Sequence, residues 1–136
     1  LVGGALGAVA TALAYRAFVH EPSSPELTRL VLPVPDLPND WSGARVVHLT
    51  DLHYGNPRSD DLFRWMVTTV NDLRPDLVLI TGDFIVRRSS EAVPAARYVG
   101  ELVARHGVVA VYGDHDYPLR ARQPGRELQE GLAAAG

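Results

Sequence analysis

Three short apolar segments decide the fold: Ala44-Arg-Val-Val-His-Leu-Thr50, Asp76-Leu-Val-Leu-Ile-Thr81 and Val108-Val-Ala-Val-Tyr112. Each has the length and the apolar, β-branched content of a buried strand. The segments between them, residues 59–73 and 90–105, show the periodicity and end signals of helices. Strands that alternate with helices predict an α/β fold with a parallel sheet. Because the strands are wholly apolar, we expect helices to cover both faces of that sheet.

The helices are expected to bury one apolar stripe each. For residues 59–73, with Ser59 as the N-cap, the predicted stripe is Leu62, Trp65, Met66, Thr69, Val70 and Leu73. For residues 90–105, it is Ala92, Ala96, Val99, Leu102 and Val103. A third helix is expected from Gln123 onward, and a further strand from Leu27 to Val34.

Composition limits the classes of protein that the chain can belong to. It has 136 residues, 46% of them hydrophobic, which is enough for one packed domain of modest size. The formal charge of −3 argues against a nucleic-acid-binding module, since such modules carry a basic face. The chain has no cysteine, which excludes disulfide scaffolds, thiolate zinc sites and cysteine nucleophiles.

The N-terminal segment differs from the rest of the chain. Residues 1–20 hold one charged side chain, Arg16, in an otherwise apolar stretch, which predicts a membrane anchor or signal segment. A buried Ala/Gly-rich helix is the alternative for this stretch. Residues 21–26, rich in proline and serine, are expected to be a linker. Residues 27–136 are then expected to form the catalytic or binding domain.

Acidic and histidine residues follow each of the three core strands. The sequences are Asp51-Leu-His53, Gly82-Asp83 and Gly113-Asp-His-Asp116. The carboxyl ends of parallel strands share one edge of the sheet, so these side chains are expected to meet in one cleft. Carboxylates brought together without a cation would repel one another, and the chain has no lysine to neutralise them. Mixed carboxylate and imidazole ligands therefore predict a metal site that suits Mn, Fe or Zn.

A nucleotide site of the Rossmann type would use the same edge of the sheet. It requires a glycine-rich first loop whose backbone amides bind phosphate. The first loop here is Asp-Leu-His-Tyr-Gly-Asn-Pro, from residue 51 to 57, which does not have that composition. The metal interpretation is therefore preferred.

The three motifs resemble the first three of the calcineurin-like metallophosphoesterase family, in particular its membrane-associated bacterial members. That family shows Asp-x-His, Gly-Asp and Gly-Asn-His-Asp/Glu, followed by a separate His and by Gly-His-x-His. The similarity covers roughly residues 27 to 120, and Asp114 stands in place of the family's asparagine. The resemblance implies a two-sheet sandwich, of which this chain is expected to hold the N-terminal half, truncated before the last two motifs.

The resemblance also implies roles for six residues. Asp51 and His53 would bind the first of two divalent metal ions, Asp83 would bridge both, and Asp114 would bind the second. The remaining two are catalytic: His115 would contact the phosphate and stabilise or protonate the leaving oxygen, and Asp116 would orient His115. A hydroxide that bridges the two metals would attack phosphorus in line.

The implied activity is hydrolysis of phosphomonoesters or phosphodiesters. A membrane anchor would suit a lipid-linked substrate and a membrane-associated protein. The resemblance alone implies that the catalytic domain is extracytoplasmic. The fragment by itself is expected to be inactive, because the last two motifs are needed to complete the site. The alternative is a non-catalytic interaction protein that keeps the fold.

Overall fold

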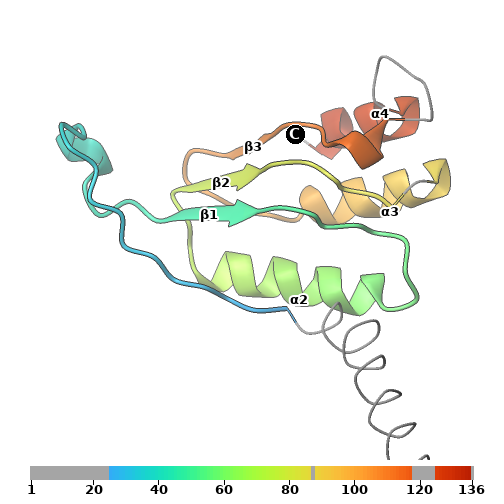
Figure 1. Ribbon diagram of the computed structural model, residues 1–136, viewed down its shortest axis with the longest axis horizontal. Helices are drawn as coiled ribbons and strands as arrows, with labels where there is room; N and C mark the ends of the chain where they lie inside the picture. Colours follow the sequence, from blue (N-terminus) through green and yellow to red (C-terminus); the bar gives the residue numbers. More distant parts are fainter. Residues whose placement is uncertain (1–24, 87, 118–124, 136) are drawn as a thin grey trace, which may run out of the picture. The chain divides into compact units, whose positions relative to one another are not determined.

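The computed structural model describes residues 25–86, 88–117 and 125–135 (Figure 1). The chain divides into two compact units, residues 1–35 and 36–136. In chain order, the elements are η3 (Asn39–Trp41), β1 (Val46–Leu49), α2 (Ser59–Asp72), β2 (Leu77–Ile80), α3 (Ser89–Val99), β3 (Val108–Ala110), η4 (Asp114–Asp116) and α4 (Arg126–Ala135). The predicted α/β class is confirmed.

The three strands form one parallel sheet in the order β1-β2-β3. The register pairs Leu49 with Ile80 and Ile80 with Ala110, so the strands end almost level with one another. All three predicted core strands are thus present, each shorter by one or two residues at its ends. The loops that leave them start from one edge of the sheet.

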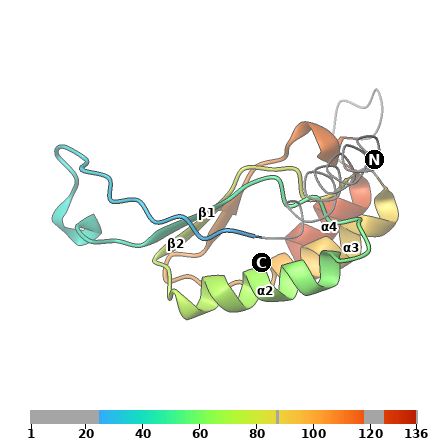
Figure 2. The same ribbon diagram turned by 60° about the horizontal axis from the view of Figure 1, so that its bottom comes forward.

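Helices α2, α3 and α4 all lie on one face of this sheet (Figure 2), which corrects the expectation of two covered faces. The reason is topological. Each crossover from a strand to its parallel neighbour is right-handed, and all of them proceed in the same direction, so their helices fall on the same side. On the opposite face, the side chains of Val46, His48 and Val109 are exposed among the described residues.

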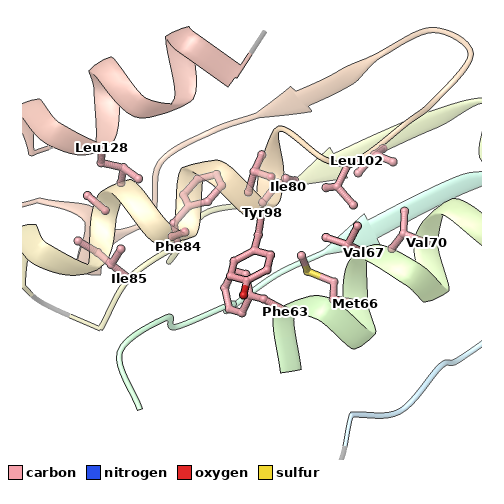
Figure 3. Close-up of a cluster of buried hydrophobic side chains, with 14 residues drawn as sticks. Phe63, Met66, Val67, Val70, Ile80, Phe84, Ile85, Tyr98, Leu102 and Leu128 are labelled. Atoms are coloured by element: carbon pink, nitrogen blue, oxygen red, sulfur yellow. The ribbon is translucent and has the colours of Figure 1, made fainter. Parts of the chain in front are cut away.

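The hydrophobic core lies between the sheet and these helices (Figure 3). Its most completely buried large side chains, Phe63, Ile80, Phe84 and Leu128, come from α2, β2, the loop after β2 and α4. Burying one such side chain stabilises the fold by about 1.5–3 kcal/mol. Phe84 directly follows Asp83, so the core holds the backbone of that loop in place.

The buried faces of two helices differ from the predicted stripes. In α2 the buried apolar residues are Phe63, Met66, Val67 and Val70, and Trp65 is 41% exposed. Ser59 is the first helical residue and not the N-cap, because its Oγ accepts hydrogen bonds from the N–H groups of Gly55 and Asn56. The side chain therefore closes the preceding loop.

Helix α3 ends at Val99, six residues before the predicted end at Arg105. The side chain of Asn71, at the end of α2, explains this difference. Its amide donates to the Glu101 carbonyl at 2.9 Å and accepts from the Val103 N–H at 2.9 Å, which holds that backbone outside the helix. Leu102 is buried as predicted, but Val103 is 67% exposed.

The predicted strand from Leu27 to Val34 is wrong. These residues form no strand or helix, and Val31 is 96% exposed. Pro25, Pro33 and Pro35 lack the N–H that a ladder needs, which limits pairing.

The predicted anchor or signal segment, residues 1–20, lies outside the described residues, as does the start of the third helix at Gln123. The described part of that helix is α4. Among the described residues, no helix combines the length and apolarity that crossing a membrane requires.

Candidate metal centre

Two groups of potential metal ligands meet at the edge of the sheet where the strands end. Asp51, His53 and Asp83 form the first, and Asp83, Asp114 and His115 form the second. Within each group the ligand atoms all lie within 4.8 Å of one another. The structure thus brings together the residues that the sequence singled out on three separate loops, with Asp83 in both groups.

The geometry of the first group fits a cation better than a set of hydrogen bonds. His53 Nε2 lies 3.6 Å from Asp51 Oδ1 and 3.7 Å from Asp83 Oδ2. Both distances are too long for good hydrogen bonds. Ligands that each lie about 2.1 Å from one ion are about 3–4 Å apart, which matches this spacing. Two carboxylates and an imidazole are also the donor set that Mn, Fe or Zn accepts.

The two carboxylate oxygens of Asp83 have different neighbours. Oδ2 lies toward His53, whereas Oδ1 accepts a hydrogen bond of 3.0 Å from the backbone N–H of His115. One side chain therefore connects the loop after β1 with the loop after β3. A carboxylate in this position can contribute an oxygen to each of two ions.

Three of the candidate ligands have strained backbone conformations. Asp51, His53 and Asp83 have φ angles of 54°, 46° and 55°, in the left-handed region that residues with a Cβ rarely adopt. Each such residue costs about 1 kcal/mol and persists only where its surroundings hold it. The sheet edge stores strain at the residues that would bind metal.

Backbone hydrogen bonds hold the loops after β1 and β2 together. The N–H groups of His53 and Tyr54 donate to the carbonyls of Asp83 and Phe84 at 2.8 and 2.9 Å, and the Val86 N–H donates to the Tyr54 carbonyl at 3.0 Å. The loops after β2 and β3 also approach closely, since a Cβ on Gly82 would overlap the backbone of Gly113. Glycine is required there for that reason as well as for its φ of 97°.

Asp116 is 1% exposed, and its carboxylate accepts four backbone hydrogen bonds. Oδ2 accepts from Asp83 and Gly113 at 3.0 and 2.9 Å, and Oδ1 from Phe84 and Ile85 at 2.8 and 3.4 Å. Burial raises the pKa of Asp116, and the four N–H donors act in the opposite direction. The side chain thus shapes the loop that presents Asp83.

His115 has a neighbour that the sequence analysis did not expect. Its Nδ1 lies 2.7 Å from the carbonyl oxygen of Val86, and its ring packs edge to face against His53 with centroids 4.7 Å apart. A carbonyl can only accept, so Nδ1 carries the proton of this bond. The Val86 carbonyl is therefore one group that orients the ring, and residue-type patterns cannot indicate it.

The family model for the calcineurin-like phosphoesterases matches residues 44–134 of the chain. The chain belongs to that family. The match covers all three strands and both groups of candidate ligands. It confirms the resemblance on which the residue roles were assigned.

Curated relatives of this chain include eukaryotic and bacterial proteins. The chain is 32% identical over 109 residues to a transmembrane protein with metallophosphoesterase domain from Danio rerio. The aligned region covers 80% of the chain and 25% of that protein. The chain is 34% identical over 98 residues to the UDP-2,3-diacylglucosamine pyrophosphatase LpxG of Chlamydia muridarum, and this alignment covers 71% of the chain and 30% of that protein. An uncharacterised metallophosphoesterase of Bacillus subtilis is 27% identical, with coverages of 71% and 35%. The chain thus spans about a quarter to a third of these relatives.

The chain has a polar cluster beside the loop after β1 that sequence analysis missed. Asp60 Oδ1, in the first turn of α2, accepts hydrogen bonds from the phenols of Tyr54 and Tyr98 at 2.8 and 2.9 Å. Burial and the neighbouring carboxylate raise the pKa of Tyr54 to about 12, and the two phenols lower the pKa of Asp60. The residues lie 6 and 38 positions apart, so only the tertiary fold brings them together.

Replacing Tyr98 by phenylalanine is expected to raise the pKa of Asp60 toward its ordinary value, since one of the two stabilising hydrogen bonds is lost. A carboxyl group whose pKa is lower in the folded state than in the unfolded state stabilises the fold at pH values above its unfolded-state pKa. This stabilisation is lost as the pH falls through the folded-state pKa. Stability should therefore decline less in the variant when the pH is lowered below about 4. Carboxyl ¹³C NMR titration and acid denaturation would measure both effects, and an unchanged Asp60 pKa would contradict the expectation.

Proposed function

We propose that the protein is a metal-dependent phosphoesterase with a dinuclear metal site. The observation behind this proposal is that Asp83 belongs to both groups of candidate ligands, with one oxygen toward His53 and the other accepting from the backbone of His115. Asp51 and His53 would complete one site and Asp114 the other. A pair of divalent ions there would activate water and stabilise the charge that develops on phosphate.

His115 is proposed to handle the proton of the leaving group. Its Nδ1–H donates to the Val86 carbonyl, and Nε2 is the ring nitrogen that would contact phosphate. Nε2 would deliver a proton to the leaving oxygen only from the imidazolium form, in which both ring nitrogens carry a proton. We assign the orientation of this ring to Val86 and a loop-shaping role to Asp116. Both differ from the division of roles expected from the resemblance.

The substrate is proposed to be a phosphomonoester, a phosphodiester or a related lipid-linked phosphate compound. The chlamydial relative is named for a diacylglucosamine pyrophosphatase, and another relative is named as transmembrane. Residues 1–20 are proposed as a membrane anchor or signal segment and 21–26 as a linker to the domain of residues 27–136. This arrangement would keep an extracytoplasmic catalytic domain near a membrane.

The exposed face of the sheet supports a second sheet in the whole protein. Val46 and Val109 are about half exposed on the face that no described helix covers. We propose that the second sheet of the sandwich packs there. The present chain would then supply half of the fold and part of the active site, and would be inactive alone.

The proposal is tested by hydrolysis of bis(p-nitrophenyl) phosphate by the full-length protein with and without Mn²⁺. Turnover should depend on added Mn²⁺, disappear with EDTA and return when Mn²⁺ is restored. About two equivalents of Mn²⁺ should bind per chain, as a two-metal site requires. A folded protein that binds no metal and hydrolyses no ester would overturn the proposal and favour a non-catalytic interaction protein.

Replacing Asp114 by asparagine is expected to raise turnover of the full-length protein while metal binding survives. The two side chains match in shape, but the carboxylate adds negative charge beside an anionic substrate and lowers the Lewis acidity of the metal pair. Steady-state phosphodiester hydrolysis at saturating Mn²⁺ would measure the effect. Unchanged or slower turnover would contradict this account of Asp114.

A further inference from the structure

The strained loop after β1 needs an anchor outside the candidate ligands. Asp51 and His53 both have left-handed φ angles, and such conformations persist only where the surroundings determine them. Backbone bonds from His53 and Tyr54 tie the loop to the loop after β2, which is itself strained at Asp83. Phe84 in the core and the hydrogen bonds to Asp116 already fix the loop after β2. The loop after β1 is tied to that loop through its backbone, and a contact of its own to a regular element would fix it further.

Tyr54, the residue directly after His53, makes that contact. Its hydroxyl donates to Asp60 Oδ1 at 2.8 Å, and its ring packs edge to face on Phe63 with centroids 5.1 Å apart. Asp60 and Phe63 both belong to α2, one turn apart. The side chain of Tyr54 thus reaches from the metal loop to the start of a helix.

Tyr98 fixes Asp60 from the other side. Its hydroxyl donates to the same Asp60 oxygen at 2.9 Å, while its ring lies 5.6 Å from that of Phe63 and is 9% exposed. Figure 3 shows Tyr98 and Phe63 together within the buried cluster. Since Asp60 belongs to α2 and Tyr98 to α3, this hydrogen bond joins Asp60 to a second helix, and the core already orders both helices.

We propose that Tyr54, Asp60 and Tyr98 are positioning residues that hold the Asp51–His53 loop in its metal-binding conformation. The inference rests on the proposed function. Asp60 contacts no candidate ligand directly, and its effect passes through the phenol of Tyr54 to the backbone of His53. Groups that orient metal ligands commonly change metal affinity when they are removed.

The test is the dissociation constant of Mn²⁺ in the full-length protein, followed by the electron paramagnetic resonance signal of free Mn²⁺. Asp60→Ala should weaken binding about fivefold, the change that one net hydrogen bond corresponds to. Tyr54→Phe should have the same effect, and the double variant should be no worse than either single one. Asp60→Asn keeps an oxygen that can accept from both phenols and should restore affinity.

Asp61→Ala is the matched control, because Asp61 is an exposed carboxylate in the same helical turn. This variant should bind Mn²⁺ like the wild type. That result would separate the effect of the Tyr54–Asp60–Tyr98 hydrogen bonds from the effects of net charge and of the helix dipole. Equal losses in Asp60→Ala and Asp61→Ala, or no loss in Asp60→Ala and Tyr54→Phe, would overturn the inference. If Asp60→Ala fails to fold, the Mn²⁺ affinity of Tyr54→Phe tests the inference instead, because that variant keeps the aromatic ring that packs on Phe63 and removes only the hydroxyl.

The same variants separate positioning from substrate binding. Positioning predicts that kcat at subsaturating Mn²⁺ falls about fivefold and recovers at saturating Mn²⁺, while KM for the phosphodiester stays constant. A raised KM that excess Mn²⁺ does not restore would overturn the inference. Failure of the proposed function is distinct, because the wild-type protein would then bind no Mn²⁺.

Discussion

Asp83→Asn is expected to lower phosphoester hydrolysis at least about a thousandfold, which corresponds to about 4 kcal/mol of transition-state stabilisation. Asp83 is the one residue that both groups of candidate ligands share. Asparagine has nearly the same shape and tolerates the left-handed φ of 55°, so the backbone conformation is retained. Its carbonyl oxygen can still accept the His115 N–H bond, but its amide nitrogen cannot bind a cation. The variant therefore removes bridging without removing the loop.

Metal stoichiometry distinguishes the two groups. Asp83→Asn should reduce bound Mn²⁺ at both sites, whereas Asp51→Asn touches only the first group and should leave about one equivalent bound. Asp72→Asn, an exposed acid at the end of α2, is the control for net charge and should change neither quantity. If Asp83→Asn retained two equivalents of Mn²⁺ and wild-type turnover, Asp83 would not be the bridging ligand.

The local sequence pattern was sufficient to predict the sheet and the edge at which the candidate metal ligands lie. Strands β1, β2 and β3 are short apolar runs, and parallel pairing places Asp51, Asp83 and Asp114 along one edge without reference to distant contacts. The direction in which the helices face was predicted less well. Trp65 is apolar and correctly spaced but exposed, because the stripe centred on Phe63 and Met66 faces the sheet.

The features that sequence analysis missed depend on tertiary contacts. Helix α3 stops at Val99 because Asn71, about thirty residues earlier, binds the backbone at Glu101 and Val103. One partner of His115 is a main-chain carbonyl, which every residue has and no residue type marks. Such contacts override local propensity, and a sequence pattern does not record them.

Asp116→Ala is expected to destabilise the fold by about 4 kcal/mol, the largest effect on stability that we predict for a polar residue. The carboxylate is 1% exposed and accepts four N–H groups. Each buried donor left without a partner costs about 1–3 kcal/mol, and entry of water would recover part of the sum. The loss should concentrate at residues 83–85, which pack through Phe84 into the core.

Urea denaturation of the metal-free protein would measure this loss separately from metal binding. Asp116→Asn should cost about 2 kcal/mol, because its Oδ1 still accepts from Phe84 while its amide meets the N–H groups of Asp83 and Gly113. Asp114→Ala removes an exposed carboxylate from the same short helix and should stay within about 0.5 kcal/mol of the wild type. If Asp116→Ala were no less stable than Asp114→Ala, water would have to satisfy the four donors, and Asp116 would be free for the catalytic role that the family resemblance first suggested.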